Sequence, residues 1–142
     1  DYIAEKIGAS IHNRRRARVG KELIDVRHHQ AGGKLPHTHA TGPHRSKLLG
    51  HLWDCVKNQP GATMYLRGHR HYHYYGEDAL GRVMVLPGMQ LPAHTDFGEL
   101  KCEGLITAGF AVLNFDDEGY YAGHSWHLYD LSNLKDTIEV MV

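Results

Sequence analysis

Several features that mark other protein classes are missing from this sequence. No apolar run is long enough to cross a bilayer, so we expect no association with membranes. Cys55 and Cys102 lack the spacing of a metal or redox motif, which predicts idle thiols in a reducing cytoplasm. Sixteen basic residues balance sixteen acidic ones, so net charge does not draw the chain toward nucleic acid or anionic lipid. The composition, 42% hydrophobic, is that of an ordinary globular domain.

Histidine is what the sequence has in abundance, with 13 imidazoles in 142 residues. Because an unperturbed imidazole titrates near pH ~6.5, the charge of this chain is sensitive to pH. Random placement alone would give roughly one His-x-His pair. The sequence contains three, which begin at His37, His69 and His71. A bare His-x-His is therefore weak evidence for a site, and its surroundings decide its weight.

The segment 65–71 gives one of these pairs a context. A short apolar strand runs into Gly68 and then into His69 and His71. Residues at i and i+2 of a strand project to the same side, so both imidazoles are expected to face one ligand. Gly68 would let the chain turn sharply and bring its backbone close to that ligand. The spacing differs from the i, i+4 pair of helical zinc proteases, and it predicts a loop-built site for a divalent metal.

A second strand with histidines at its end lies upstream, in segment 23–29. It is an apolar run that ends in His28 and His29. Two strands that each end in histidine can converge at one edge of a sheet, where ligand sites of α/β proteins lie. The sequence therefore predicts a metal site at such an edge. The alternative is a set of histidines scattered over the surface.

The hydrophobic pattern predicts a mixed α/β chain without repeats. We expect strands over 10–19 and 22–27 on either side of a turn at Gly20-Lys21, and a loop over 30–43. From His44, apolar residues recur at i, i+1, i+4, i+5 and i+8, which predicts an amphipathic helix that ends before Pro60. Further elements are a short helix within 2–9 and strands over 63–67, 82–86, 108–115 and 120–128.

The basic run from Arg14 to Arg18 has two interpretations. It could contact a phosphate backbone, or it could form the solvated outer side of the first hairpin. Solvated faces are the more common explanation for a charge run, and no aromatic residues alternate with these arginines. We therefore predict the solvated face.

The order of these motifs resembles the C-terminal half of the calcineurin-like metallophosphoesterases, and in particular their phage-borne branch. The likeness runs from about Ile11 to Tyr129 and includes Gly68-His69-Arg70-His71 followed by the strand that ends in Leu86-Pro87-Gly88. It implies an α/β fold that is part of a four-layer αββα sandwich, with mixed and antiparallel strands and few helices. It also implies that residues 1–142 form a single domain, the C-terminal portion of the family's domain.

The resemblance also implies a site with two divalent metal ions, drawn from Mn, Fe, Zn, Ni and Co. His28 and His69 would share one ion, and His71 would bind its neighbour. His28 is preferred to His29 because the family ligand is usually the first residue after the strand. The residues expected to contact substrate are His29, His37, His39, Arg70 and His94.

The departures from the family pattern are equally informative. The Asp-x-His, Gly-Asp-x-x-Asp and Gly-Asn-His-Asp/Glu motifs, which supply the family's remaining ligands, do not occur here, so no catalytic residue is assigned. The chain begins at Asp1, and we expect it to be part of a longer polypeptide whose N-terminal segment completes the site.

Two functions remain open at this point. The complete protein would hydrolyse phosphate esters, including nucleotides or nucleic acid, in the cytoplasm (of the host, if phage-encoded), whereas this segment alone would be inactive. The alternative is a degenerate or accessory, non-catalytic metal-binding domain of a phage protein.

Overall fold

The computed structural model describes residues 6, 14–29, 35–88 and 107–129 of the chain. Its elements are β1 (Arg14–Val19), β2 (Glu22–Arg27), a 3-10 turn η1 (Pro36–Thr38), α2 (Thr41–Val56), β3 (Met64–Arg67), β4 (Tyr74–Asp78), β5 (Gly81–Val85), β6 (Ala108–Phe115) and β7 (Tyr121–Tyr129). None of the described helices is long and apolar enough to cross a membrane.

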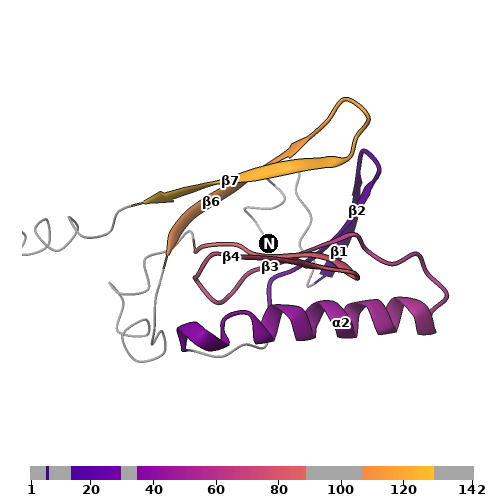
Figure 1. Cartoon of the computed structure of the whole chain (residues 1–142), viewed down its shortest axis with the longest axis horizontal. Coiled ribbons are helices and arrows are strands. Elements are labelled where there is room, and N and C mark those ends of the chain that lie inside the picture. The colour runs from indigo at the N-terminus through magenta and orange to yellow at the C-terminus, as the bar shows by residue number, and fades with distance from the viewer. Residues whose placement is uncertain (1–5, 7–13, 30–34, 89–106, 130–142) are drawn as a thin grey trace, which may run out of the picture.

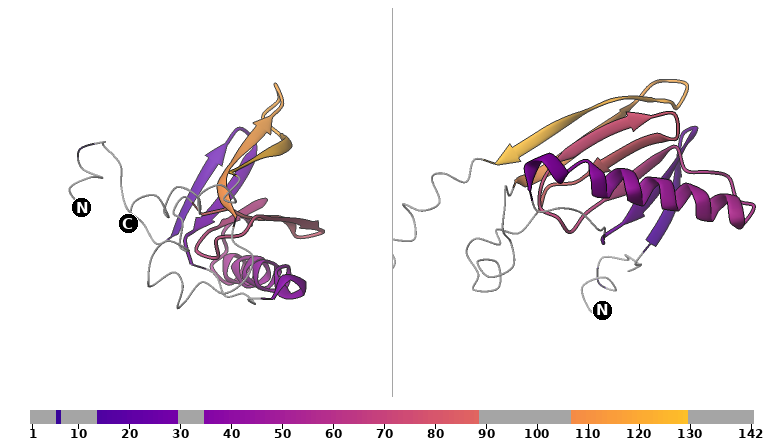
Figure 2. Two further views of the ribbon diagram at one scale, coloured as in Figure 1. Left: turned by 90° about the vertical axis from the view of Figure 1, so that its left-hand side faces the viewer. Right: turned by 60° about the horizontal axis from the view of Figure 1, so that its bottom comes forward.

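These elements form three layers (Figures 1 and 2). A twisted five-stranded sheet in the order β1-β2-β3-β5-β4 lies in the middle, with α2 along one face and the separate β6-β7 hairpin over the other. The predicted mixed α/β class with few helices is confirmed by this arrangement. One helix layer and two sheet layers make up three of the four layers of an αββα sandwich.

The centre of the five-stranded sheet is parallel, and its edges are antiparallel. β2, β3 and β5 run side by side in the same direction, whereas β1 and β4 pair with them as hairpin partners. Parallel strands are covered on both faces and so read as continuous apolar runs. Met64, Val83, Met84 and Val85 of this centre are fully buried. The carboxyl ends of β2, β3 and β5 therefore share one edge of the sheet.

Two glycines allow the two sheets to touch at their hairpin tips. Gly20 and Gly119 both adopt positive φ, at 56° and 86°, and Lys21 donates its backbone N–H to the Gly119 carbonyl at 2.8 Å. A Cβ on Gly20 would lie 2.5 Å from that carbonyl oxygen, which no side chain tolerates. The tip of the β1-β2 hairpin thus fixes one end of the β6-β7 hairpin.

Helix α2 packs with its polar side inward. The residues it buries are Gly42, Pro43, Lys47, Gly50 and Asp54. Its large apolar side chains point the other way and are 45 to 76% exposed: Leu48, Leu49, Leu52, Trp53 and Val56. The helix is amphipathic as predicted, but Leu49 does not belong to the core. Leu49→Ala therefore leaves no internal cavity.

A buried charge network explains why the polar side faces inward. Asp25 of β2 and Arg67 of β3 are both fully buried and form an ion pair of 2.9 Å on the sheet face that α2 covers. Arg67 also donates its Nε to Ser46 of α2 at 2.8 Å, and Arg14 of β1 bridges to both Asp25 and Asp54. Buried charges need partners, so the helix presents its own polar side chains to the sheet.

Several expectations of the sequence analysis are corrected here. The basic run is not wholly a solvated face, because Arg14 and Arg16 point toward Asp54 while Arg15 and Arg18 stay exposed. The predicted loop over 30–43 contains η1 and the first turn of α2, where Pro43 is tolerated because this turn needs no backbone donor. Strand β4 was not predicted.

The remaining element predictions are confirmed within the described residues. The strands β2, β3, β5, β6 and β7 lie within one residue of their expected bounds, whereas α2 begins three residues before the predicted His44. The helix expected within 2–9 lies outside the described residues, apart from Lys6, and so do residues 10–13 of the first strand.

Candidate metal centre

The candidate site lies at the carboxyl edge of the parallel strands. His28 and His29 follow directly after β2, and His69 follows β3 by two residues. Because β2 and β3 are parallel neighbours, with Arg27 opposite Arg67, their ends lie side by side. Each of the three histidines offers a ring nitrogen, and these atoms lie within 4.8 Å of one another.

The three rings form a compact cluster on the surface. The centroids of His28 and His69 are 5.3 Å apart, those of His28 and His29 4.9 Å, and those of His29 and His69 4.3 Å. The rings of His29 and His69 are stacked in nearly parallel planes, with 15° between them, and all three residues are exposed. The cluster is open enough for a ligand to reach it from solvent.

The Gly-His-x-His segment is not an extension of β3. His69 and His71 both adopt positive φ, at 75° and 56°, a backbone region that is costly for residues with a Cβ. The expectation that two strand positions place both imidazoles on one side is therefore wrong in its geometry. The chain turns instead at both histidines, and such strain concentrates at functional sites.

Backbone hydrogen bonds hold this strained segment in place. The Gly68 N–H donates to the Arg27 carbonyl at 3.2 Å, and the Thr107 N–H donates to the His71 carbonyl at 2.7 Å. A Cβ on Gly68 would approach the His28 carbonyl oxygen to 3.4 Å, so the glycine lets this backbone pass close to His28. The segment is thus fixed between the end of β2 and the start of β6.

Partial burial and neighbouring charges favour the neutral form of two of these imidazoles, His69 and His71. Burial, followed by the neighbouring His29 and His28, lowers the pKa of His69 below its usual value. Burial and then His28 lower the pKa of His71 as well. A neutral imidazole has the free lone pair that a metal requires.

His71 lies beside the cluster but is not a member of it. It is half-buried, and its Nδ1 has no hydrogen-bond partner within the described residues. A buried polar atom without a partner is costly, and a bound ligand is one way to satisfy it. Its role as the ligand of a second ion stays a prediction.

The structure places the other predicted residues as follows. Arg70 is half-buried and close enough to His69 to lower its pKa. The His39 ring stacks on Tyr72 at 4.0 Å between centroids, His37 is exposed in η1, and neither belongs to the cluster. His94 lies outside the described residues. His29, expected to contact substrate, instead lies among the possible metal ligands.

The donor set suits a borderline transition metal. Three imidazoles are typical ligands for Zn, Cu, Fe or Ni, whereas Mg and Ca prefer oxygen. No carboxylate belongs to the group, as far as the described residues extend. Asp25, three residues before His28, is buried and already forms ion pairs with Arg14 and Arg67. The residues present therefore fit one metal ion, with coordination positions left open.

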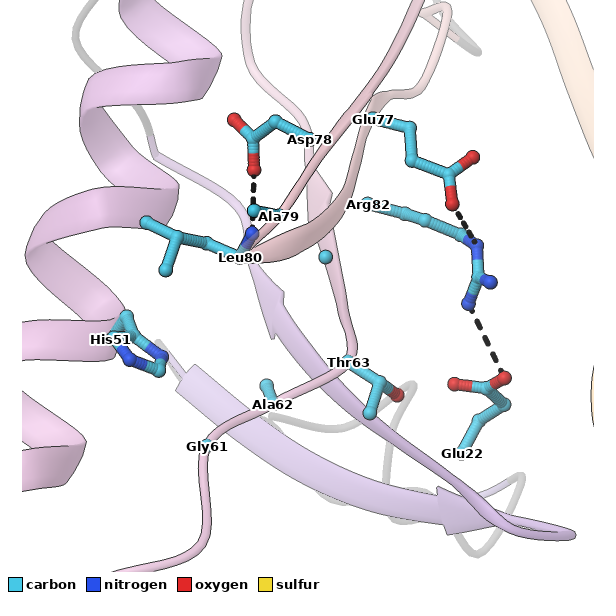
Figure 3. Close-up of a pocket in the computed structure, with 11 residues that line it drawn as sticks. Glu22, His51, Gly61, Ala62, Thr63, Glu77, Asp78, Ala79, Leu80 and Arg82 are labelled. Atoms are coloured by element: carbon cyan, nitrogen blue, oxygen red, sulfur yellow. Dashed lines mark hydrogen bonds and ion pairs between the residues drawn. The ribbon is translucent and has the colours of Figure 1, made fainter.

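A pocket of about 450 Å³ lies at the opposite, amino edge of the same strands (Figure 3). Its charged groups are already paired, because Arg82 bridges Glu22 and Glu77 at 3.3 Å each. Asp78 is paired with Lys47. The hydrogen bond that this ammonium donates is the main reason why the pKa of Asp78 falls to about 2. This pocket contains no cluster of unpaired ligands like the one at the histidine edge.

Comparison with known proteins gives matches among solved structures and none among protein families or curated proteins. A scan against protein-family models gives no match, and a search of curated proteins gives none either. Among solved structures, wild-type Vps29 of Entamoeba histolytica, crystallised with Zn²⁺, matches with a TM-score of 0.47 and 11% identity. The alignment covers 86% of this chain and 64% of Vps29, which is a metallophosphoesterase-fold protein.

Two further matches are archaeal and bacterial. A hypothetical protein of Pyrococcus horikoshii gives a TM-score of 0.45 at 14% identity, over 99% of this chain and 50% of that one. A Thermotoga maritima protein solved by NMR gives 0.42 at 19%, over 92% and 60%. The chain thus spans between half and two thirds of the length of the structures it matches. These matches assign no function to this chain.

Proposed function

We propose that this chain supplies the histidine ligands of a dinuclear metal centre that hydrolyses phosphate esters. The observation that carries the proposal is the convergence of His28, His29 and His69, from two separate strand ends, to within 4.8 Å of one another. Two of the three residues belong to the motifs on which the resemblance to metallophosphoesterases rests.

In this proposal each residue has a distinct role. His28 and His69 hold one ion, with His29 as the competing ligand from the same strand end, and His71 holds the neighbouring ion. When bound, the two cations would supply charge to polarise the phosphoryl oxygens and to lower the pKa of a water molecule. Arg70 adds a positive charge beside His69, where the phosphate of the substrate would lie.

The proposal requires ligands from outside the described residues. Among the described residues no carboxylate joins the cluster, so in this proposal the N-terminal segment of a longer polypeptide would supply the bridging carboxylates. Nucleotides or nucleic acid are the substrates proposed for a phage-encoded enzyme in the host cytoplasm, with His37, His39 and His94 beside the phosphate.

A second candidate is a non-catalytic metal-binding domain. The observation that favours it is the same lack of a carboxylate, since a site of imidazoles alone binds one ion without the charge that phosphoryl transfer demands. The two candidates share the metal site and differ in hydrolysis.

The metal site is tested by titrating the purified chain with Co²⁺ and Zn²⁺, following the visible absorption of Co²⁺ and the heat of Zn²⁺ binding. We expect one ion per chain and a loss of binding in His69→Ala. His127→Ala is the matched control, because His127 is an exposed imidazole that stacks on Phe110 of the β6-β7 hairpin. Equal binding by the two variants would contradict the proposal.

Hydrolysis is tested in a longer polypeptide that contains this chain together with the proposed N-terminal segment. There, His69→Ala and His71→Ala should each lower kcat by several orders of magnitude, because loss of a ligand removes both water activation and charge stabilisation. His127→Ala should leave the rate unchanged. If metal binding depends on His69 while hydrolysis does not, the accessory-domain function replaces the phosphoesterase.

A further inference from the structure

A tryptophan of the β6-β7 hairpin lies beside a histidine that the proposed metal centre does not use. The centroids of the Trp126 ring on β7 and of the His73 ring, directly before β4, are 5.3 Å apart. Trp126 lies on the inner side of the hairpin, because His124, two residues earlier on the same strand, contacts Tyr75 of β4 at 4.6 Å between centroids. The two rings thus bridge the two sheets.

The register of the central sheet places His73 at the same edge as the histidine cluster. One row of paired residues crosses β2, β3, β5 and β4 at this edge: Arg27, Arg67, Val85 and Tyr74. His28 and Gly68 follow this row, whereas His73 precedes it because β4 runs in the opposite direction. Neighbouring strands are ~4.8 Å apart, so the backbone at His73 lies about 10 Å from that at Gly68, across the end of β5.

The segment between β3 and β4 connects the cluster to this ring pair. It carries His69, His71 and His73 at alternate positions. Thr107 fixes its second half, because the Thr107 N–H donates to the His71 carbonyl at 2.7 Å and its hydroxyl lies 3.3 Å from Nδ1 of His73. Thr107 directly precedes β6, so these contacts also hold the hairpin, and with it Trp126, at the edge where the cluster lies.

We infer that Trp126 and His73 form a subsite for the nucleobase of a mononucleotide whose phosphate lies at the histidine cluster. This inference rests on the proposed function and adds the residues that recognise the organic part of the ester. A ligand with a phosphate at one end and a planar ring at the other spans the distance between the cluster and the ring pair. Aromatic side chains stack on nucleobases, because every base has a π face.

The surroundings of the pair favour a neutral planar ring as its ligand. His73 is exposed and Trp126 half-buried, so solvent reaches the pair. The rings beside the indole, His73 and His124, are inclined to it by 58° and 79°, so neither of them stacks in parallel with it. Within the described residues, the hydrogen-bond partner of His73 is the Thr107 hydroxyl and no carboxylate, so a cationic ligand would lack a counter-charge there.

The outer side of the same hairpin offers a matched control. Phe110 of β6 and His127 of β7 stack with 4.8 Å between centroids and 10° between planes. His127 directly follows Trp126 on the strand, so the two side chains project to opposite faces. This second pair of an aromatic ring and an imidazole therefore faces away from the central sheet, and its removal should not affect a nucleobase at the histidine edge.

The test is the binding of AMP and of ribose 5-phosphate, which lacks the base, to the purified chain loaded with Zn²⁺. Trp53 and Trp126 are the two tryptophans of the chain, so a Trp53→Phe background leaves Trp126 as the single indole reporter. We expect AMP to quench its fluorescence. In calorimetric titrations AMP should bind about 5- to 100-fold more tightly than ribose 5-phosphate, the range typical of one base stacked on an aromatic side chain.

Three variants assign this preference to the inner side of the hairpin. Trp126→Ala should remove the preference for AMP without changing Zn²⁺ binding, because the indole is not a metal ligand. Trp126→Phe should retain most of it, since the ring is kept. Phe110→Ala should bind both compounds as the parent chain does.

Equal affinities for AMP and ribose 5-phosphate in the loaded chain would overturn the inference and leave the metal centre intact. A preference that persists in Trp126→Ala, or tighter binding of AMP without quenching of Trp126, would also overturn it. Failure to bind Zn²⁺ would contradict the proposed function instead. The same comparison in EDTA then decides, because a preference for AMP there supports the subsite and equal binding overturns it. If Trp126→Ala does not fold, the quenching of Trp126 and the preference in Trp126→Phe decide.

Discussion

The same two strands carry two clusters of polar side chains that differ in every respect. Within β2 and at the end of β3, Asp25 and Arg67 are fully buried and paired with opposite charges. A few residues further on, His28, His29 and His69 are exposed, alike in chemistry and without an opposite charge in their group. The charges of the first cluster neutralise one another, whereas the imidazoles of the second have no opposite charge in their group and are open to a ligand from solvent.

This difference separates a structural role from a functional one. A buried charge that lacks its partner costs several kcal/mol, so the Asp25–Arg67 network holds α2 against the sheet. Three neighbouring imidazoles stabilise nothing by themselves, and the backbone at His69 adopts a costly positive φ to bring them together. A fold that keeps such an arrangement is expected to use it, and metal binding is the use that imidazoles offer.

The largest effect should come from breaking the paired cluster. Asp25→Ala leaves the buried guanidinium of Arg67 without its carboxylate, and we expect a loss of about 3–5 kcal/mol in the free energy of unfolding. His28→Ala, three residues later, should change it by less than about 0.5 kcal/mol. Urea denaturation of both variants without metal makes the comparison, and similar losses would remove the distinction between the two clusters.

A smaller and more specific effect should come from relieving the strain at His69. His69→Gly and His69→Ala should both weaken Zn²⁺ binding by about 100-fold or more, because both remove a ligand. In the absence of metal, the glycine variant should be more stable than the alanine variant by about 1 kcal/mol, since glycine accepts positive φ. Calorimetric titration and urea denaturation measure the two effects. Equal stability would show that the backbone relaxes at this position.

The histidines should also make stability depend on pH. The pKa values of His69, His71 and His124 are all lowered, with burial as the first cause, so the folded chain binds fewer protons than the unfolded chain. Their contribution is complete above the unfolded value near pH ~6.5 and is lost as pH falls through the folded values. The melting temperature in EDTA should therefore fall from pH ~7.5 to ~5.5, and less so in His71→Ala. A melting temperature that stays constant over this range would contradict the shifts.

The smallest effect should be hydrolysis by the chain on its own. Because the described part of the cluster holds imidazoles and no bridging carboxylate, we expect little metal-dependent turnover of bis-p-nitrophenyl phosphate by the purified 142 residues. Robust turnover with Mn²⁺, abolished in His69→Ala, would mean that the described and remaining residues of this chain already form a complete site.

Much of the secondary structure could be predicted because local patterns encode it. The first hairpin follows from Gly20-Lys21 between two extended runs, and the end of α2 follows from Pro60. Strand β4 was missed because its sequence, Tyr74–Asp78, follows a histidine-rich loop and carries a glycine. Within the described residues β4 pairs with β5 alone, and this partner became visible in the tertiary structure.

The candidate site was partly accessible to sequence reasoning. Segments 23–29 and 65–71 each read as a strand that ends in histidine, which was enough to expect His28 and His69 at one edge. The ligand group of the structure adds His29 and leaves out His71. Whether one or both of two adjacent histidines join the ligand group depends on the backbone at the strand end, and a spacing pattern does not contain that information.

By itself, the sequence determined the alternation of elements and the presence of two histidine-bearing strand ends, since apolar periodicity and turn residues act locally. Only the tertiary structure decided the orientation of α2, the inward course of Arg14 and Arg16 and the positive φ of His69 and His71. Each of these depends on residues distant in the chain. The helix turns its leucines outward because buried Asp25 and Arg67 require polar partners, and that requirement outweighs the burial of an apolar face.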